Sequence, residues 1–273
     1  MLFFTLAAVA CMGQQEYTSP AGYDLSSPVT IKMPAILDEI SGISFSDKSD
    51  TVYAVQDENG TVFHFKPGDK DLGATKFAKK GDYEDISVFN DQLVVLRSDG
   101  SLYLFPVNET SQAEAVHVKE WKKMVPGGEY EALYADPATR EIVVLCKQCA
   151  ADKKTSNVTG YVLQWANDSL FIKDRFTLDA AAISKGSSKH KGAFRPSALA
   201  RNPRTGQWYI LSSVNKMLVL ADKNWQITET HTLRPSLFPQ PEGIAFDKNG
   251  HLFISNEKGT AGYGTILKFE LKQ

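Results

Sequence analysis

Three glutamates occupy the same position in a recurring sequence motif and could act together as metal ligands. They are Glu84, Glu131 and Glu242, and each stands two residues before the apolar residue that ends its motif. Carboxylates that converge without counter-charges repel one another and raise one another's pKa values. A hard cation resolves this conflict, and oxygen ligands without histidine or cysteine favour Ca²⁺ over Zn²⁺. If the motifs converge in space, these glutamates predict a calcium site.

Two further acids are candidate ligands of the same ion. Asp57 and Glu257 each follow an apolar run that we expect to form the second strand of its unit. The competing interpretation is that the carboxylates accept backbone N–H bonds or pair with nearby cations. The cations considered are Arg97, Lys147 and Arg195.

The motif occurs five times, and its spacing predicts the fold. Ser41 and Ser197 replace the glutamate in the first and fourth copies, and Arg195 replaces the acid or amide that opens the other copies. A period of roughly 40–50 residues is the length of one β-propeller blade. The copies are Glu39–Ile43, Asp82–Ile86, Glu129–Leu133, Arg195–Leu199 and Gln240–Ile244.

Each motif opens a unit with the same order of elements. A short apolar stretch leads into a cluster of Asn, Asp, Pro or Gly, residues that set or tolerate turn dihedrals. Two more apolar runs follow, rich in β-branched and aromatic residues, and then a more polar fourth run that suits an outer edge. In the second unit this fourth strand is expected at residues 115–118. The pattern predicts an all-β protein, with a five-bladed β-propeller favoured over a β-sandwich.

The fifth unit lacks a fourth strand, because the sequence ends soon after its third one. Residues 29–33 form an unused strand candidate before the first motif. We predict that this segment completes the last blade and closes the ring, since propellers leave only short, protected edges. The first strand of each blade would then line a central channel, where the glutamates converge.

Composition and motifs exclude several functions. The net charge is −2, and no basic stripe alternates with aromatic residues, so nucleic-acid binding is not expected. The sequence has no glycine-rich phosphate loop, no His-Glu-x-x-His and no Gly-x-Ser-x-Gly motif. Its five histidines share no position in the repeat, so neither a triad nor a histidine metal site is expected.

The N-terminus predicts export. Residues 2–10 form an apolar run too short to span a bilayer but suited to a signal peptide. Small residues precede Cys11, which we expect to be lipidated; ordinary cleavage near residues 13–14 is the alternative. We therefore expect a signal at residues 1–13, an exposed segment at 14–27 and the propeller at 28–273. Any membrane association would be through the lipid alone.

The sequence contains one Cys-x-x-Cys motif, formed by Cys146 and Cys149. A redox motif or half of a zinc site would need a thioredoxin-like unit or a second cysteine pair, and neither is present. In an exported protein a structural disulfide is the favoured interpretation.

The phased motifs resemble those of the SdiA-regulated (YjiK-like) family. The resemblance rests on the Ser-Gly-Ile, Tyr-Glu-Asp-Ile, Tyr-Glu-Ala-Leu and Pro-Glu-Gly-Ile sequences, with Asp57 and Glu257 in matching surroundings, and it covers about residues 28–272. It implies a five-bladed propeller distantly similar to NHL-repeat proteins, with a bound calcium ion. It carries no established activity.

Two functions are consistent with these features. The favoured one is a calcium-binding module at the cell envelope that binds a small molecule or an envelope protein. The other is a Ca²⁺-dependent hydrolase of esters, lactones or phosphoesters, which needs a general base beside the metal. We favour the binding module because the sequence shows no histidine or lysine with a clear place in the channel.

Overall fold

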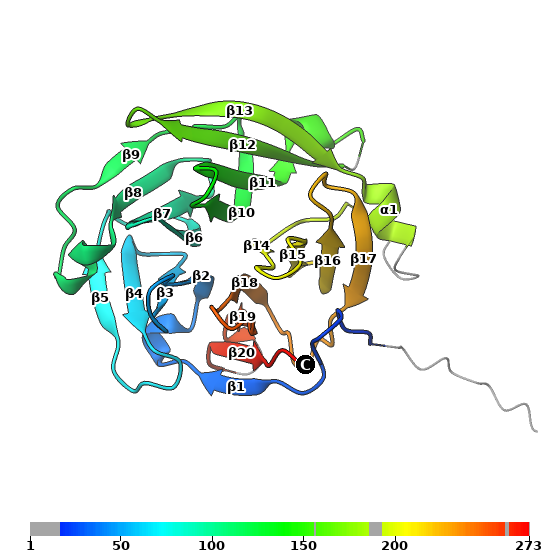
Figure 1. Ribbon diagram of the computed structural model, residues 1–273, viewed down its shortest axis with the longest axis horizontal. Coiled ribbons are helices and arrows are strands. Elements are labelled where there is room, and N and C mark those ends of the chain that lie inside the picture. The colour runs from blue at the N-terminus through cyan, green and yellow to red at the C-terminus, as the bar shows by residue number, and fades with distance from the viewer. Residues whose placement is uncertain (1–16, 156, 186–192, 260–261, 273) are drawn as a thin grey trace, which may run out of the picture.

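The protein is a five-bladed β-propeller in a computed structural model that describes residues 17–155, 157–185, 193–259 and 262–272. In these residues, five four-stranded antiparallel sheets surround a central axis (Figure 1). The expected signal at 1–13, including Cys11, lies outside the described residues. Within them, no helix has both the length and the apolar character needed to cross a membrane.

Each sheet runs from an inner strand beside the axis to an outer strand at the rim (Figure 1). The first four sheets are continuous in sequence. They comprise β2 Ile40–Phe45, β3 Val52–Gln56, β4 Thr61–Phe65 and β5 Gly73–Lys76; β6 Tyr83–Phe89, β7 Gln92–Arg97, β8 Leu102–Pro106 and β9 Lys119–Trp121; β10 Gly128–Asp136, β11 Glu141–Cys149, β12 Val158–Ala166 and β13 Ser169–Leu178; and β14 Ala198–Arg201, β15 Trp208–Ser212, β16 Met217–Ala221 and β17 Ile227–Thr232.

The fifth sheet joins the two ends of the propeller, as predicted. It contains β18 Pro241–Phe246, β19 Leu252–Asn256 and β20 Thr265–Phe269, with β1 Val29–Lys32 on its outer edge. Strand β1 pairs antiparallel with β20 in a register that places Val29 opposite Lys268. The predicted closure is therefore confirmed, and β1 covers the edge of β20 that would otherwise be open.

The hydrophobic core lies between neighbouring blades. One cluster joins Phe89 and Leu96 of the second blade to Leu133 and Val144 of the third, and four comparable clusters fill the other interfaces. Each inner strand also contacts the next one around the ring. This packing makes the positions of the inner strands depend on every blade. The short helices lie in connections: η1 Ala35–Leu37, η2 Val107–Ser111, η3 Ala150–Asp152 and α1 Ala180–Lys185.

The fourth strand of the second blade was predicted in the wrong place. It is β9, at Lys119–Trp121, rather than residues 115–118. The backbone before it pairs instead with the outer strand of the first blade: Lys76 donates to the carbonyl of Ala113 at 3.0 Å, and Ala115 donates to that of Lys76 at 2.8 Å. The segment thus bridges two blades before it joins its own.

The segment expected to be exposed, residues 14–27, is partly buried from residue 17 onward. Tyr23 and Leu25 are 6% and 5% exposed and pack into the cluster between the fourth and fifth blades. The Tyr23 hydroxyl donates to the carbonyl of Gly250 at 2.7 Å. Lys272 donates its backbone N–H to the carbonyl of Gly22 at 2.8 Å. We call residues 17–27 the N-terminal latch, because they bind both the core and the C-terminal residues.

Candidate functional site

The recurring glutamates are bulged residues of the inner strands. Between β6 and β7 the register moves from Tyr83 directly to Asp85, which leaves Glu84 outside the regular pairing. The same shift leaves Glu131 outside the pairing of β10 and Glu242 outside that of β18. A β-bulge redirects the side chain of the extra residue. The repeat therefore places three redirected carboxylates beside the central axis.

Close packing of the inner strands explains a glycine in two of the motifs. A Cβ atom added to Gly42 would lie 2.5 Å from the Cα of Asp85, and one added to Gly243 would lie 2.5 Å from the carbonyl oxygen of Ser41. Only glycine allows neighbouring inner strands to approach this closely. The bulges are consequently held against one another around the ring.

Burial and mutual repulsion perturb the three motif glutamates. Desolvation, followed by the charges of Glu131 and Asp82, raises the pKa of Glu84 to about 10. Desolvation raises the pKa of Glu131 to about 7, although Lys147 opposes the shift. The pKa of Glu242 is raised by desolvation and lowered in part by hydrogen bonds to serine hydroxyls. These carboxylates act on one another as one group.

The two second-strand acids belong to the same electrostatic cluster. Desolvation and then the charge of Glu242 raise the pKa of Glu257 to about 8, and Asp57 adds to this shift. Desolvation also raises the pKa of Asp57, with further contributions from the charges of Glu39 and other acids. We call Glu84, Glu131, Glu242, Glu257 and Asp57 the acidic cluster.

Two lysines share this region: Lys147, which was among the pairing partners considered, and Lys216, which was not singled out from the sequence. The ammonium group of Lys147 binds the carboxylate of Glu131 and lies 3.8 Å from Glu129 Oε1. Lys216 donates to the carbonyl of Pro239 at 2.5 Å, and desolvation lowers the pKa of its ammonium group while Glu242 opposes that shift. The charge of the acidic cluster is thus only partly neutralised.

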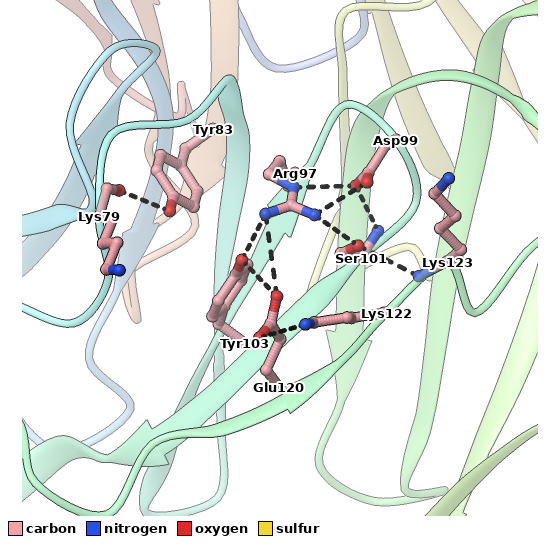
Figure 2. A network of polar contacts seen from close by, with 9 residues as sticks. All are labelled: Lys79, Tyr83, Arg97, Asp99, Ser101, Tyr103, Glu120, Lys122 and Lys123. Carbon is pink, nitrogen blue, oxygen red and sulfur yellow. Dashed lines mark hydrogen bonds and ion pairs between the residues drawn. The ribbon is translucent and has the colours of Figure 1, made fainter.

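Neither arginine considered as a partner forms an ion pair with the acidic cluster in the described residues. Arg97 donates two hydrogen bonds to the carboxylate of Asp99, from Nε at 3.0 Å and from Nη2 at 2.8 Å. Figure 2 shows how the same guanidinium also donates to the hydroxyl of Tyr103, which donates to Glu120. This network stabilises the second blade. Arg195 is exposed and forms no ion pair within the described ranges.

The donors of the acidic cluster fit a hard cation chemically. All five are carboxylates, and their raised pKa values reflect an environment that disfavours uncompensated negative charge. Among the described residues, the Oδ1 atom of Asp57 is buried without a hydrogen-bond partner, an acceptor that a cation would satisfy. Lys147 already binds Glu131, so an incoming cation would compete with its ammonium group.

Among the described residues, the acidic cluster does not bring three candidate ligand atoms within 4.8 Å of one another, but another group does. Within the described part of the chain, only Cys146, Cys149 and Asp152 bring three such atoms within 4.8 Å of one another. The two sulfur atoms are joined in a disulfide, and Asp152 accepts hydrogen bonds from Thr159 at 2.6 and 3.1 Å. A disulfide offers no thiolate to a metal, so this group is structural as it stands.

Asp85 was not among the residues singled out from the sequence, yet it joins two blades. It is 2% exposed and accepts the backbone N–H groups of Ile86 at 2.8 Å and Leu133 at 2.7 Å. It therefore links the inner strands of two blades by accepting backbone N–H bonds, the structural role that was considered above for the glutamates. The signal was its place beside Glu84 in the second motif, where other copies have glycine or alanine.

Comparison with known proteins agrees with this architecture. A family model described as SdiA-regulated matches residues 21–133 and 170–259. None of the curated proteins compared with the chain matches it. Two solved structures, each 11% identical in sequence, share the fold over most of their length. They are a luciferin-regenerating enzyme, with a TM-score of 0.54 over 90% of this chain and 99% of that one, and the calcium-binding protein regucalcin from Agrobacterium tumefaciens, with a TM-score of 0.53 over 93% and 95%.

Proposed function

The chain belongs to the SdiA-regulated family, and we propose that it is a calcium-binding β-propeller that acts as a binding module. The observation that carries the proposal is the acidic cluster: three bulged glutamates from the inner strands of three blades, with two acids that follow second strands, perturb one another's pKa values. A similar solved structure is of a calcium-binding protein, which supports the choice of ion.

In this proposal, Glu84, Glu131 and Glu242 would hold the ion, with Asp57 and Glu257 beside them. When bound, Ca²⁺ would neutralise the cluster and offer positive charge to an oxygen atom of a ligand. The chain's own residues position the carboxylates by bulges and exclude bulk water by burial. Lys147 keeps Glu131 paired when the ion is absent.

Thermal unfolding of metal-stripped protein tests the proposal. A ligand at 100 times its dissociation constant stabilises a protein by about 2.7 kcal/mol. For a domain of this size, each kcal/mol raises the melting temperature by about 2–4 °C. We expect Ca²⁺ to raise it by about 5–10 °C, and Glu84→Gln or Glu242→Gln to lose most of the increase. A melting temperature that Ca²⁺ leaves unchanged would contradict the proposal.

The matched control is Glu120→Gln. Glu120 belongs to the Arg97 network in Figure 2 rather than to the acidic cluster. Its loss should lower stability without changing the response to Ca²⁺. An equal loss of response in this variant would mean that the effect is not specific to the cluster.

A hydrolase is the second candidate, and Lys216 is the observation that favours it. This desolvated lysine lies within electrostatic reach of Glu242 and Glu257 and is a candidate general base beside the metal. Ca²⁺-dependent turnover of lactones, esters or phosphoesters would support the hydrolase if Lys216→Met abolished it in a folded protein. Absence of turnover across these substrates would favour the binding module.

We also propose that the protein is exported and anchored by a lipid on Cys11. The support is the apolar run at residues 2–10 followed by small residues and that cysteine. Cell fractionation of the wild type and Cys11→Ser provides the test. We expect the wild type in the membrane fraction and the variant outside it; the same distribution for both would contradict lipidation at this residue.

A further inference from the structure

A cavity of about 280 Å³ lies beside the acidic cluster, where the third blade meets the fourth. It is lined by the end of β11, the connection through η3, and residues 193–195. Lys147 lines this cavity and also binds Glu131, so the cavity and the acidic cluster share a side chain. We call it the Arg195 cavity.

The Arg195 cavity carries an excess of positive charge. Lys147, Lys153 and Arg195 line it, with Asp152 as the only acid among its described lining residues. The carboxylate of Asp152 is already engaged by the backbone and hydroxyl of Thr159. In the part of the chain that the structure describes, neither Lys153 nor Arg195 forms an ion pair. Two cationic side chains thus remain available to a ligand.

This positive charge arises where the sequence departs from its own repeat. The first residue of the motif is acidic in Glu39, Asp82 and Glu129 but is Arg195 in the fourth copy. The same copy has Ser197 where the second, third and fifth copies have glutamate. The two polar motif columns are therefore acidic in most copies, whereas the fourth copy carries a cation and a neutral hydroxyl. Such juxtaposed charges orient a ligand that carries a negative group.

Local structure holds the walls of the cavity in place. The Cys146–Cys149 disulfide closes a short ring that includes Lys147. Asp152 fixes the connection after β11 through its two bonds to Thr159. On the opposite wall, Phe194 is 3% exposed, which anchors the backbone that carries Arg195. Preorganised walls reduce the entropy lost when a ligand binds.

We propose that the Arg195 cavity binds the carboxylate or phosphate group of a small molecule, through Arg195, Lys153 and Lys147. The guanidinium fork of arginine suits the oxygen pairs of both groups. The cavity volume of about 280 Å³ is just below the usual range for ligand pockets, about 300–1,000 Å³, which restricts the ligand to a small molecule. The proposal rests on the proposed function in one respect: a Ca²⁺ ion in the acidic cluster would add positive charge near the cavity and strengthen binding of the anionic group.

Titration with two simple anions tests this inference. Methyl phosphate and acetate are added separately to calcium-loaded and metal-stripped protein, and binding is followed by NMR or calorimetry. We expect at least one anion to bind, and Arg195→Gln to weaken its binding by about tenfold or more, as loss of a charge-assisted hydrogen bond should. Lys153→Gln should weaken it less. The anion that binds more tightly identifies the group that the cavity prefers.

Lys223→Gln is the matched control, because Lys223 is an exposed lysine outside the cavity. It should bind the anion as the wild type does. The inference would be overturned if neither anion bound to the calcium-loaded protein or to the metal-stripped protein. It would also be overturned if Arg195→Gln bound the anion as tightly as the wild type does. If anion binding depended on Arg195 but Ca²⁺ did not stabilise the protein, the calcium proposal would fail and the cavity proposal would stand. If Ca²⁺ stabilised the protein but no anion bound, the cavity proposal would fail and the calcium proposal would stand.

Discussion

Lys147 and Glu131 form an ion pair in which the carboxylate is almost completely buried and the ammonium group partly exposed. The pair lies between the acidic cluster and the Arg195 cavity. Glu131 is the bulged residue of β10, and Lys147 is near the end of the paired strand β11. One hairpin of the third blade therefore supplies both a candidate metal ligand and the cation that neutralises it without metal.

Replacing Lys147 by methionine should weaken the metal-free protein and increase its response to Ca²⁺. Breaking a buried ion pair costs about 3–5 kcal/mol, and partial exposure of Lys147 reduces this cost. Without the ammonium group, Glu131 must be neutralised by a proton or a metal ion. We expect a lower melting temperature without Ca²⁺ and a larger increase with it than in the wild type.

Lys122→Met is the control for this change, because the ammonium group of Lys122 is exposed and lies 3.8 Å from Glu120. This substitution should change the melting temperature by no more than about 2 °C, both without Ca²⁺ and with it. If Lys147→Met responded to Ca²⁺ as the wild type does, the ammonium group and the ion would not compete for Glu131.

The metal-free protein should lose stability as the pH rises. The pKa values of Glu131, Glu257 and Glu84 are raised from 4.5 to about 7, 8 and 10 in the folded state. The folded protein therefore retains protons that the unfolded chain releases. This contribution is fully present below about pH 4.5 and is lost as the pH rises through these values. Urea unfolding between about pH 5 and 9 measures it.

Glu84→Gln should flatten this pH dependence, since the amide does not titrate. Ca²⁺ should stabilise the wild type more at about pH 8 than at about pH 6, because the ion then competes with fewer protons. An unfolding free energy that rises over this range in the metal-free wild type would contradict the raised pKa values of these carboxylates.

The repeat made the blades and the glutamate column predictable, because both depend on local spacing. The bulges were not predictable, since the register of Glu84 or Glu131 is defined only against the neighbouring strand. The ion pair of Lys147 was one of several pairings left open, because Lys147 lies outside the motif. The position of β9 was missed because residues 113–115 pair with the first blade. This contact joins two units, so the sequence pattern within one unit does not predict it.

Asp85→Ala should strongly destabilise the fold without affecting the acidic cluster directly. The substitution leaves the buried N–H groups of Ile86 and Leu133 without their acceptor. Each unsatisfied buried group costs about 1–3 kcal/mol. We expect a loss of about 2–6 kcal/mol in the free energy of unfolding, measured with urea.

Ser87→Ala is the milder comparison, because the Ser87 hydroxyl accepts a single backbone bond, from Ala135 at 3.0 Å. It should cost less than Asp85→Ala, and Asp85→Asn should fall between the two. An Asp85→Ala variant as stable as the wild type would show that the carboxylate does not link the blades.

Removal of N-terminal residues should lower stability in steps that match the contacts of each segment. The protein that lacks residues 1–16 is the reference for the series, because it keeps every contact described above. Deleting residues 1–27 also removes the N-terminal latch, with the buried side chains of Tyr23 and Leu25, each worth about 1.5–3 kcal/mol. Deleting residues 1–33 removes β1 as well and exposes the edge of β20.

The largest step should be the last one, because closure of the ring ends with β1. An exposed strand edge also templates pairing with other chains, so we expect the shortest protein to aggregate as it melts. Thermal melting and size-exclusion chromatography of the three proteins measure both effects. The closure would be unimportant for stability if the protein lacking residues 1–33 remained monomeric and melted at the same temperature as the one lacking residues 1–27.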